Sequence, residues 1–283
     1  MRKVITVIAI AAALILIAVS MGVCASLISL DKIRGGNVAL LNLKGTIVTS
    51  DNKLEDIRKL KKDDSIKAVV LRIDSPGGVV GASQELYTEI KKLSAIKPVV
   101  VSMGDVAASG GYYVACGATK IFANPGTITG SIGVRMEHVN YQDLLRWAKI
   151  ERQTLKSGEH KDIGSSIKPM TAEEKELLEG VLIDMHDQFK SDIAESRKIP
   201  REEVDKIADG RVYTGRKALE LGLVDQLGTL NDAIDEAAKL AGIKGDPKLR
   251  EVSENEPWWL DLVLEKAGSL VSEAGHYLAL YKM

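Results

Sequence analysis

The sequence predicts an α/β fold, a parallel sheet with crossover helices, preceded by one N-terminal transmembrane helix. Two observations support this. Short apolar runs alternate with segments of helical periodicity between Val38 and Ala123, and strands separated by helices of this length form parallel sheets. In addition, Val4–Leu30 is a run of 27 residues without a charge, long enough as a helix to cross a hydrocarbon core of about 30 Å.

Arg2 and Lys3 precede the uncharged run and orient it. Positive residues stay on the cytoplasmic side, which predicts a single-pass protein of the cell membrane with its catalytic domain on the extracytoplasmic face. The apolar region of a cleaved secretory signal is usually about 7–15 residues, so the longer run favours a retained anchor over residues 1–31. The alternative is a cleaved signal, because the small residues that end at Ala25 are placed like a cleavage site.

Composition excludes several classes of protein. The 283 residues carry a formal net charge of -1, with 45% hydrophobic and 27% charged residues, which is typical of a globular domain. No basic block is present, so nucleic acid is not an expected partner. Cys24 and Cys116 lie in apolar stretches, and the four histidines show no metal-ligand spacing. We therefore expect no disulfide framework, no metal and no cofactor.

The elements of the first half follow in order. We expect strands over residues 38–43, 66–73, 98–103 and 120–123. A short helix carries Leu54, Ile57 and Leu60, and a longer one turns Leu86, Ile90 and Leu93 inward. A further helix opens at Ser109.

The second half is more helical. Thr171 and Glu174 form a capping box for a long helix. We expect its inward face to carry Leu178, Val181, Leu182, Met185 and Phe189. Two more helices cover 216–221 and 231–240, and each ends near a glycine that can cap it.

Two glycine-rich turns are the first sign of chemistry. Residues 74–78 follow the second strand and residues 104–111 the third, and functional groups in parallel α/β sheets gather at the carboxyl ends of strands. A serine at a helix start, such as Ser109, has its oxygen beside free amides and suits a nucleophile with an oxyanion hole. The simpler alternative is that Ser109 only caps the helix.

Known phosphate-binding and hydrolase motifs are absent from these turns. The chain lacks Gly-x-x-x-x-Gly-Lys-Ser/Thr and Gly-x-Gly-x-x-Gly, and Ser109 stands in Ala-Ala-Ser-Gly-Gly instead of Gly-x-Ser-x-Gly. A serine nucleophile also needs a base, and no histidine lies in a recognisable arrangement. A lysine can serve when burial lowers its pKa.

Four motifs in order give a specific family resemblance. They are Arg-Ile-Asp-Ser-Pro-Gly-Gly at 72–78, Gly-Asp-Val-Ala-Ala-Ser-Gly-Gly-Tyr-Tyr at 104–113, Thr-Gly-Ser-Ile-Gly-Val at 129–134 and Lys-Ser-Gly-Glu-His-Lys-Asp at 156–162. With them, the chain resembles the short single-domain form of signal peptide peptidase A from residue 36 to residue 243. The resemblance implies a Clp/crotonase-like fold and the activity of a Ser-Lys serine endopeptidase.

The resemblance also implies roles for individual residues. Ser109 matches the nucleophile, Lys161 the general base and Ser131 the residue that orients the lysine amine. The oxyanion hole comes from the amides of Gly110 and of the Gly77-Gly78 pair, with Gly78 preferred within that pair. Only the match to the motif favours Lys161 as the general base over two neighbouring lysines, Lys156 and Lys168.

Other residues near the motifs have plainer roles. We expect Asp162 to be structural, Ser75 to be a turn residue because Pro76 follows it, and Tyr112 and Tyr113 to belong to the core or to a pocket wall.

Domain limits and partners follow from the same resemblance. We expect an anchor over 1–31, a Ser-Lys peptidase domain over 32–249 and a C-terminal helical extension over 250–283. The expected partners are peptide substrates such as cleaved signal peptides, the lipid bilayer, and copies of the chain in a homo-oligomer with shared active sites. Two alternatives stay open: an acyl-CoA enzyme of the crotonase type and a non-catalytic membrane scaffold. Residues 257–264, with Trp258 and Trp259, suit a membrane interface, a subunit contact or simple packing.

Overall fold

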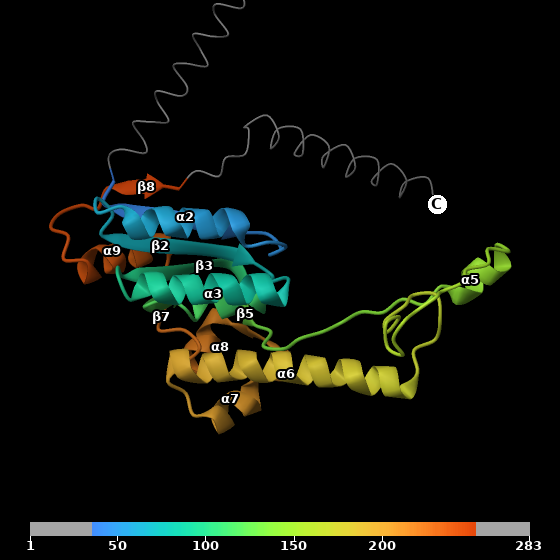
Figure 1. Ribbon diagram of the computed structural model, residues 1–283. Coiled ribbons are helices and arrows are strands. Elements are labelled where there is room, and N and C mark those ends of the chain that lie inside the picture. Colours follow the sequence, from blue (N-terminus) through green and yellow to red (C-terminus); the bar gives the residue numbers. More distant parts are fainter. Residues whose placement is uncertain (1–35, 253–283) are drawn as a thin grey trace, which may run out of the picture. The chain divides into compact units, whose positions relative to one another are not determined.

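The computed structural model describes residues 36–252, and they form an α/β domain around one eight-stranded sheet (Figure 1). The strands are β1 (Val38–Lys44), β2 (Ala68–Ser75), β3 (Val99–Ala108), β4 (Lys120–Ala123), β5 (Ile128–Gly130), β6 (Val212–Thr214), β7 (Gln226–Leu227) and β8 (Leu249–Glu251). The helices are α2 (Asp51–Lys62), α3 (Val80–Ser94), α4 (Gly110–Ala115), α5 (Gln142–Trp147), α6 (Ala172–Arg197), α7 (Arg201–Ile207), α8 (Gly215–Glu220) and α9 (Leu230–Leu240).

The strands run in the order β6-β5-β3-β2-β1-β8, and β4 pairs with β3 and with β7. Every pairing is parallel except β5 with β6, which makes the sheet mixed. The four predicted strands and the crossover helices between them are confirmed. The expected parallel sheet is mixed because β6 pairs antiparallel with β5, and its three residues are too few to show as an apolar run.

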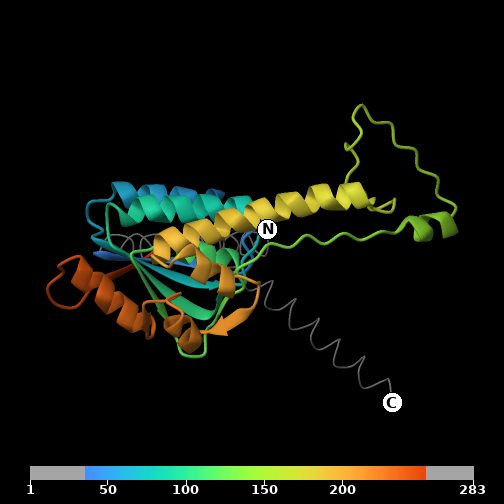
Figure 2. The ribbon, with the colours of Figure 1, turned by 90° about the horizontal axis from the view of Figure 1, so that it is seen from below.

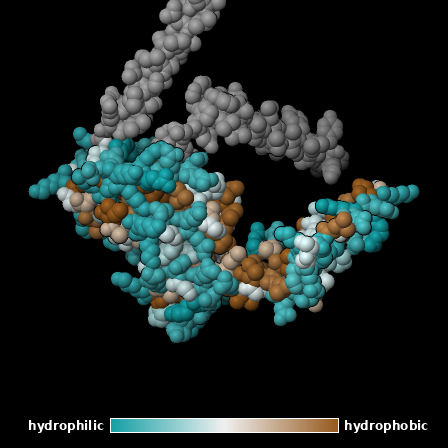
Figure 3. All heavy atoms as spheres, in the orientation of Figure 1, coloured by the Kyte–Doolittle hydropathy of each residue, from teal (hydrophilic) through white to brown (hydrophobic). Residues whose placement is uncertain are grey.

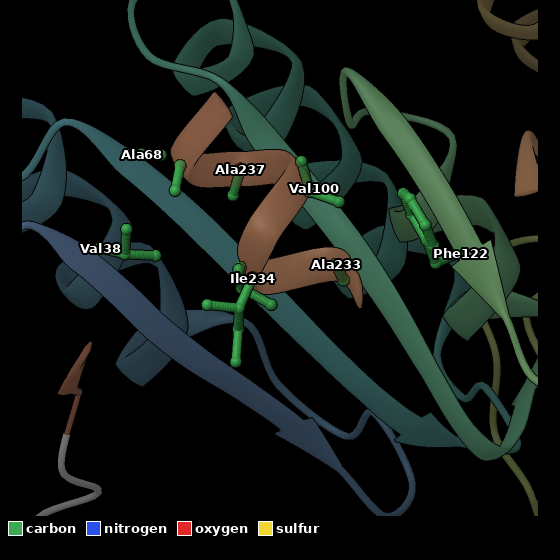
Figure 4. Close-up of a cluster of buried hydrophobic side chains, with 9 residues drawn as sticks. Val38, Ala68, Val100, Phe122, Ala233, Ile234 and Ala237 are labelled. Atoms are coloured by element: carbon green, nitrogen blue, oxygen red, sulfur yellow. The ribbon is translucent and has the colours of Figure 1, made fainter. Parts of the chain in front are cut away.

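The pleat of the sheet explains how both faces are covered. Alternate residues of a strand point to opposite faces. Val38, Val100 and Phe122 point to the face that α9 covers, where they pack with Ala233 and Ile234 (Figure 4). The other face lies under α2 and α3, with α9 on the opposite side of the sheet (Figure 2). On that face the buried contacts come from Leu41, Leu71, Ile57, Leu86 and Ile90.

Helix α6 begins at the predicted capping box, in which the Thr171 hydroxyl accepts from the Glu174 amide and the Glu174 carboxylate accepts from the Thr171 amide. Its C-terminal half packs on the domain, where the ring of Phe189 stacks on that of Tyr113 at a centroid distance of 4.3 Å. Its first half projects from the domain together with the segment before it, as Figures 1 and 2 both show. We call residues 134–184 the arm.

The arm corrects one expectation about α6. Of the five residues expected on its inward face, Phe189 is buried, whereas Val181 is 45% exposed and Leu178, Leu182 and Met185 are partly exposed. The apolar stripe exists, but the chain's own domain covers only its C-terminal end. The remainder of the stripe is exposed or partly exposed in the described part of the chain.

The ends of the described region bear on the predicted domain limits. No helix within residues 36–252 is long and apolar enough to span a bilayer, and the anchor expected over Val4–Leu30 lies outside the described residues. Strand β8 pairs with β1 and crosses the expected boundary at residue 249, so Arg250 and Glu251 belong to the sheet. The extension expected beyond them lies outside the described residues from position 253 onward.

Candidate active site

Ser109 stands at the point where β3 ends and α4 begins. Strand β3 continues to Ala108, so residues 104–108 are strand and not the glycine-rich turn expected there. The chain reverses at Ser109 itself, which has φ 53° and ψ -121°, a conformation that a residue other than glycine rarely adopts. Its side chain makes no capping hydrogen bond, and its Oγ has no hydrogen-bond partner within residues 36–252. Ser109 is therefore held in a strained turn with a free hydroxyl.

Two glycines beside this turn, Gly77 and Gly110, lie too close to their neighbours to carry a side chain. A Cβ added to Gly77 would lie 2.5 Å from the Gly110 nitrogen and 2.8 Å from the Ser109 Cβ. A Cβ added to Gly110 would lie 3.2 Å from the Gly78 nitrogen. The absence of side chains thus lets two backbone segments meet beside the hydroxyl.

The amides of these glycines differ in what they contact. The Gly77 amide donates to the Ser75 Oγ at 3.1 Å and is engaged. The amides of Gly78 and Gly110 have no acceptor among the residues that the structure describes, and the Gly110 amide is the first of a helix. Two free N–H groups next to a free serine hydroxyl can stabilise the oxyanion of an acyl-transfer reaction.

Ser131 lies beside Ser109 because β5 pairs with β3. The register places Gly130 opposite Ala108, and the Ser109 amide donates to the Gly130 carbonyl oxygen at 2.8 Å. Ser131 follows directly, half-buried, with a positive φ of 51°. The two serines therefore follow the ends of neighbouring strands.

Lys161 lies elsewhere. It is exposed, in a turn where its amide donates to the Gly158 carbonyl oxygen, and its side chain has no polar partner in the described part of the chain. Both views place residues 150–170 at the far end of the arm, away from β3 and α4 (Figures 1 and 2). The structure brings Ser109, Ser131 and the glycines together within one chain, and it does not bring Lys161 to them.

The two alternative lysines are held by the arm itself. The Nζ of Lys156 lies 2.7 Å from a carboxylate oxygen of Asp162, and that of Lys168 lies 3.4 Å from the other. Lys168 also pairs with Glu174, and this hydrogen bond raises the pKa of Lys168, which keeps the amine charged. These contacts agree with a structural role for Asp162 and disfavour Lys168 as a base.

The remaining residues near the motifs are structural. Ser75 is fully buried, and its hydroxyl holds a turn amide. Tyr112 is buried and donates to the Leu223 carbonyl oxygen at 2.9 Å, and the Tyr113 hydroxyl donates to Asp192. Burial raises the pKa of the Cys116 thiol to about 12.

Two surface features bear on how the site could bind substrate or a second chain. A groove of about 530 Å³ starts at Val80, two residues after Gly78, and runs between α3 and α6 with Val181 and Met185 on its other wall. The arm carries exposed apolar surface, which Figure 3 shows as brown atoms along its length. The most exposed of its apolar side chains are Val139, Leu144, Trp147, Leu155 and Ile183.

Comparisons with known proteins agree with this architecture. The model of peptidase family S49 matches residues 91–244, and that of Clp protease matches residues 44–128. A Synechocystis protein with a provisional protease name is 44% identical over 74% of this chain and 76% of its own length. The chloroplastic serine protease SPPA of Arabidopsis thaliana is 36% identical over 81% of this chain, which spans 33% of that protein. Protease 4 of Haemophilus influenzae is 31% identical over 83% of this chain and 40% of its own length.

The matched regions coincide with the site. The S49 match contains Ser109, Ser131 and Lys161. The Clp protease match contains residues 77–79, which we call the glycine loop. The chain belongs to peptidase family S49: it is a protease with a Clp-protease-like α/β fold.

Proposed function

We propose that this protein is a membrane-anchored serine endopeptidase that uses Ser109 as nucleophile and Lys161 as general base. Residues 1–31 anchor it in the cell membrane, and the peptidase domain works on the extracytoplasmic face. Its substrates are peptides at the membrane, remnant signal peptides among them. The apolar groove that begins at Val80 suits extended hydrophobic peptides of this kind.

The reaction is an acyl transfer. The neutral amine of Lys161 takes the proton of the Ser109 hydroxyl as the oxygen attacks a peptide carbonyl, and the amides of Gly78 and Gly110 stabilise the oxyanion. The lysine then protonates the leaving amine, and water hydrolyses the acyl-enzyme through the same base. Ser131 orients the lysine amine from its place beside Ser109.

One observation carries the proposal about the base. Ser109, Ser131 and the two free amides lie together in one chain, whereas the segment that holds Lys161 lies at the far end of the arm (Figure 2). We propose that the arm of one copy brings Lys161 to Ser109 of a neighbouring copy in a homo-oligomer. The exposed apolar residues of the arm, with Trp147 at 82% and Leu155 at 88%, are the surface that such an assembly would cover.

Assembly also supplies a condition that the chemistry needs. A lysine amine has an ordinary pKa of about 10.4 and is almost wholly protonated near neutral pH, so it cannot accept a proton there. Burial against a neighbouring subunit disfavours the charged form and makes a lysine a usable base. An exposed lysine on an isolated arm does not meet this condition, so the free monomer would be inactive.

The nucleophile is tested with a serine-reactive fluorophosphonate. It should label the wild-type protein at Ser109 and leave Ser109→Ala unlabelled, and peptide hydrolysis should be lost in parallel while circular dichroism stays unchanged. Labelling of Ser109→Ala, or hydrolysis within about tenfold of wild type, removes Ser109 from the role. An acyl-CoA enzyme or a non-catalytic scaffold would give no labelled serine and no peptide hydrolysis.

The anchor is tested by fractionation. The full chain should stay with membranes through carbonate extraction. Soluble mature protein that starts after Ala25 would support the cleaved signal instead.

A further inference from the structure

We propose that Ser75 is a positioning residue of the oxyanion hole: its hydroxyl holds the Gly77 amide so that the Gly78 amide faces Ser109. The proposal rests on the proposed function, because it assumes that an oxyanion forms beside Ser109. It adds a residue that touches neither the substrate nor the nucleophile and acts only through the glycine loop.

The hydrogen bonds of residues 77–79 carry the argument. The Gly77 amide donates to the Ser75 Oγ at 3.1 Å, and the Gly77 carbonyl oxygen accepts from the Ile47 amide at 2.9 Å. The Val79 amide donates to the Ile47 carbonyl oxygen at 2.8 Å, and the Val79 carbonyl oxygen accepts from the Ser83 hydroxyl at 2.9 Å. Only the N–H and C=O of Gly78 lack a partner among the described residues. The loop is therefore fixed on both sides of the one amide that remains free.

Backbone atoms alone do not complete this arrangement. Residues 77–79 have six polar backbone atoms. The Gly77 carbonyl oxygen, the Val79 N–H and the Val79 carbonyl oxygen hydrogen-bond to backbone groups, the last of them to the Ser83 amide, and the two atoms of Gly78 have no partner among the described residues. The sixth, the Gly77 N–H, depends on a side chain, because its acceptor is the Ser75 hydroxyl. Gly77 is buried and Gly78 is exposed, so water does not replace that acceptor as easily as it reaches the neighbouring amide.

The position of Ser75 is rigid. The residue is fully buried at the end of β2, where the register against β3 shifts after Ile73. Gly111 passes so close that an added Cβ there would lie 2.9 Å from the Ser75 carbonyl oxygen. The hydroxyl is thus built into the sheet directly beneath the glycine loop, with the helix that starts after Ser109 packed against it.

Removal of the hydroxyl leaves a buried N–H without an acceptor. Two adjacent glycines, one with φ +96°, are free to rotate toward a conformation in which the Gly77 amide regains a partner. Any such rotation turns the Gly77-Gly78 peptide plane and moves the Gly78 N–H away from the place where the oxyanion forms. The substitution should therefore weaken stabilisation of the transition state without weakening the binding of the ground-state substrate.

The test compares Ser75→Ala with Ser102→Ala in the full-length assembled protein. Ser102 is a matched control because it is also fully buried in the sheet, on β3, where it accepts a hydrogen bond from Arg72 at 2.8 Å and does not contact the glycine loop. For Ser75→Ala we expect kcat to fall about tenfold to a hundredfold while KM stays within about twofold of wild type. This fall in kcat is smaller than the loss of about 10²–10³ that follows removal of an oxyanion-hole donor, because the Gly78 amide is displaced and not removed. Ser102→Ala should keep kcat within about twofold.

A second readout separates positioning from a general loss of stability. A peptide aldehyde forms a hemiacetal whose oxygen occupies the oxyanion hole, so its inhibition constant should rise with the loss in kcat/KM. The inhibition constant of the corresponding peptide amide should not change. The proposal fails if Ser75→Ala loses no more kcat than Ser102→Ala, or if aldehyde and amide weaken equally. Activity in Ser109→Ala is a separate result, which would overturn the proposed function itself and this proposal with it.

Discussion

Gly110 allows the most direct test of the site geometry, because its α carbon lies where no side chain fits. A Cβ at this position would lie 2.3 Å from the Ser83 Oγ and 3.2 Å from the Gly78 nitrogen. Carbon and oxygen atoms that are not bonded pack at about 3.5 Å, so Gly110→Ala requires a displacement of about 1 Å. The Ser83 hydroxyl can turn away only by giving up its hydrogen bond to the Val79 carbonyl oxygen, which helps to hold the glycine loop.

This displacement would move the Gly110 amide relative to the Gly78 amide, and these are the two donors of the oxyanion hole. A misplacement of about 1 Å in a reacting geometry can cost about 10² in rate, and the loss of one donor costs about 10²–10³ in kcat. We therefore expect Gly110→Ala to lower kcat by about 10²–10³ while overpacking costs about 1–3 kcal/mol of stability.

The control for this experiment is Gly81→Ala. Gly81 lies in the first turn of α3, three residues from Gly78, and an added Cβ there meets no atom within 4 Å. The change should leave kcat within about twofold and stabilise the helix by up to about 1 kcal/mol. Kinetics of peptide hydrolysis and thermal unfolding of both variants decide the matter. Gly110→Ala with a kcat within tenfold of wild type would refute the geometry described for the oxyanion hole.

Three further predictions follow from the arm and the core. Lys161→Arg should abolish hydrolysis because arginine stays charged, whereas Lys156→Ala should keep most of it. Normal hydrolysis by Lys161→Arg would remove Lys161 from the role. Trp147→Ala should shift the assembly toward smaller species in analytical ultracentrifugation without lowering the unfolding midpoint of the dissociated chain, in which the residue is 82% exposed. An unchanged assembly would contradict this. Burial raises the pKa of the Cys116 thiol to about 12. In a Cys24→Ser background, a maleimide at about pH 8 should therefore label Cys116 only after the protein is unfolded. Rapid labelling of the folded protein would contradict this, because it would show an accessible thiolate.

Much of the core is readable from the sequence because its strands are long and apolar. Strands β1 to β4 and the helices between them appear where apolar runs and helical periodicity predict them, and Thr171 begins α6 as its capping box indicates. Strands β5 to β8 have two or three residues each, too few for a pattern to form. Their pairing depends on tertiary contacts, so only the motif at 129–134 marks the place of Ser131.

The arm shows a different limit. An apolar stripe on a helix predicts that the face is buried, but it does not say by which chain. On α6 the stripe from Leu178 to Phe189 continues past the point where the helix leaves its own domain. The same reasoning applies to the site. A motif can assign a role to Lys161, whereas the distance between the arm and Ser109 becomes visible only in the fold (Figure 1).

The supports of the glycine loop are likewise hidden in the sequence. Ile47 contacts the loop through an isolated bridge to Gly78, and Ser83 contacts it from the first turn of α3. Neither residue stands in a recognisable motif. Their contribution arises from one backbone bridge and one buried hydroxyl, and such contacts leave no periodic trace in the chain.

The shared active site is the central claim, and mixing two inactive variants tests it most directly. Ser109→Ala retains Lys161, and Lys161→Ala retains Ser109, so neither variant alone should hydrolyse peptides. When equal amounts are unfolded and assembled together, random mixing in a head-to-tail ring pairs an intact serine with a neighbour's intact lysine at about one quarter of the sites. We therefore predict recovery of about one quarter of wild-type activity per chain, and none when Ser109→Ala is mixed with the double variant. A mixture that assembles and stays inactive would contradict the account, because the serine and lysine of each site would then belong to a single chain.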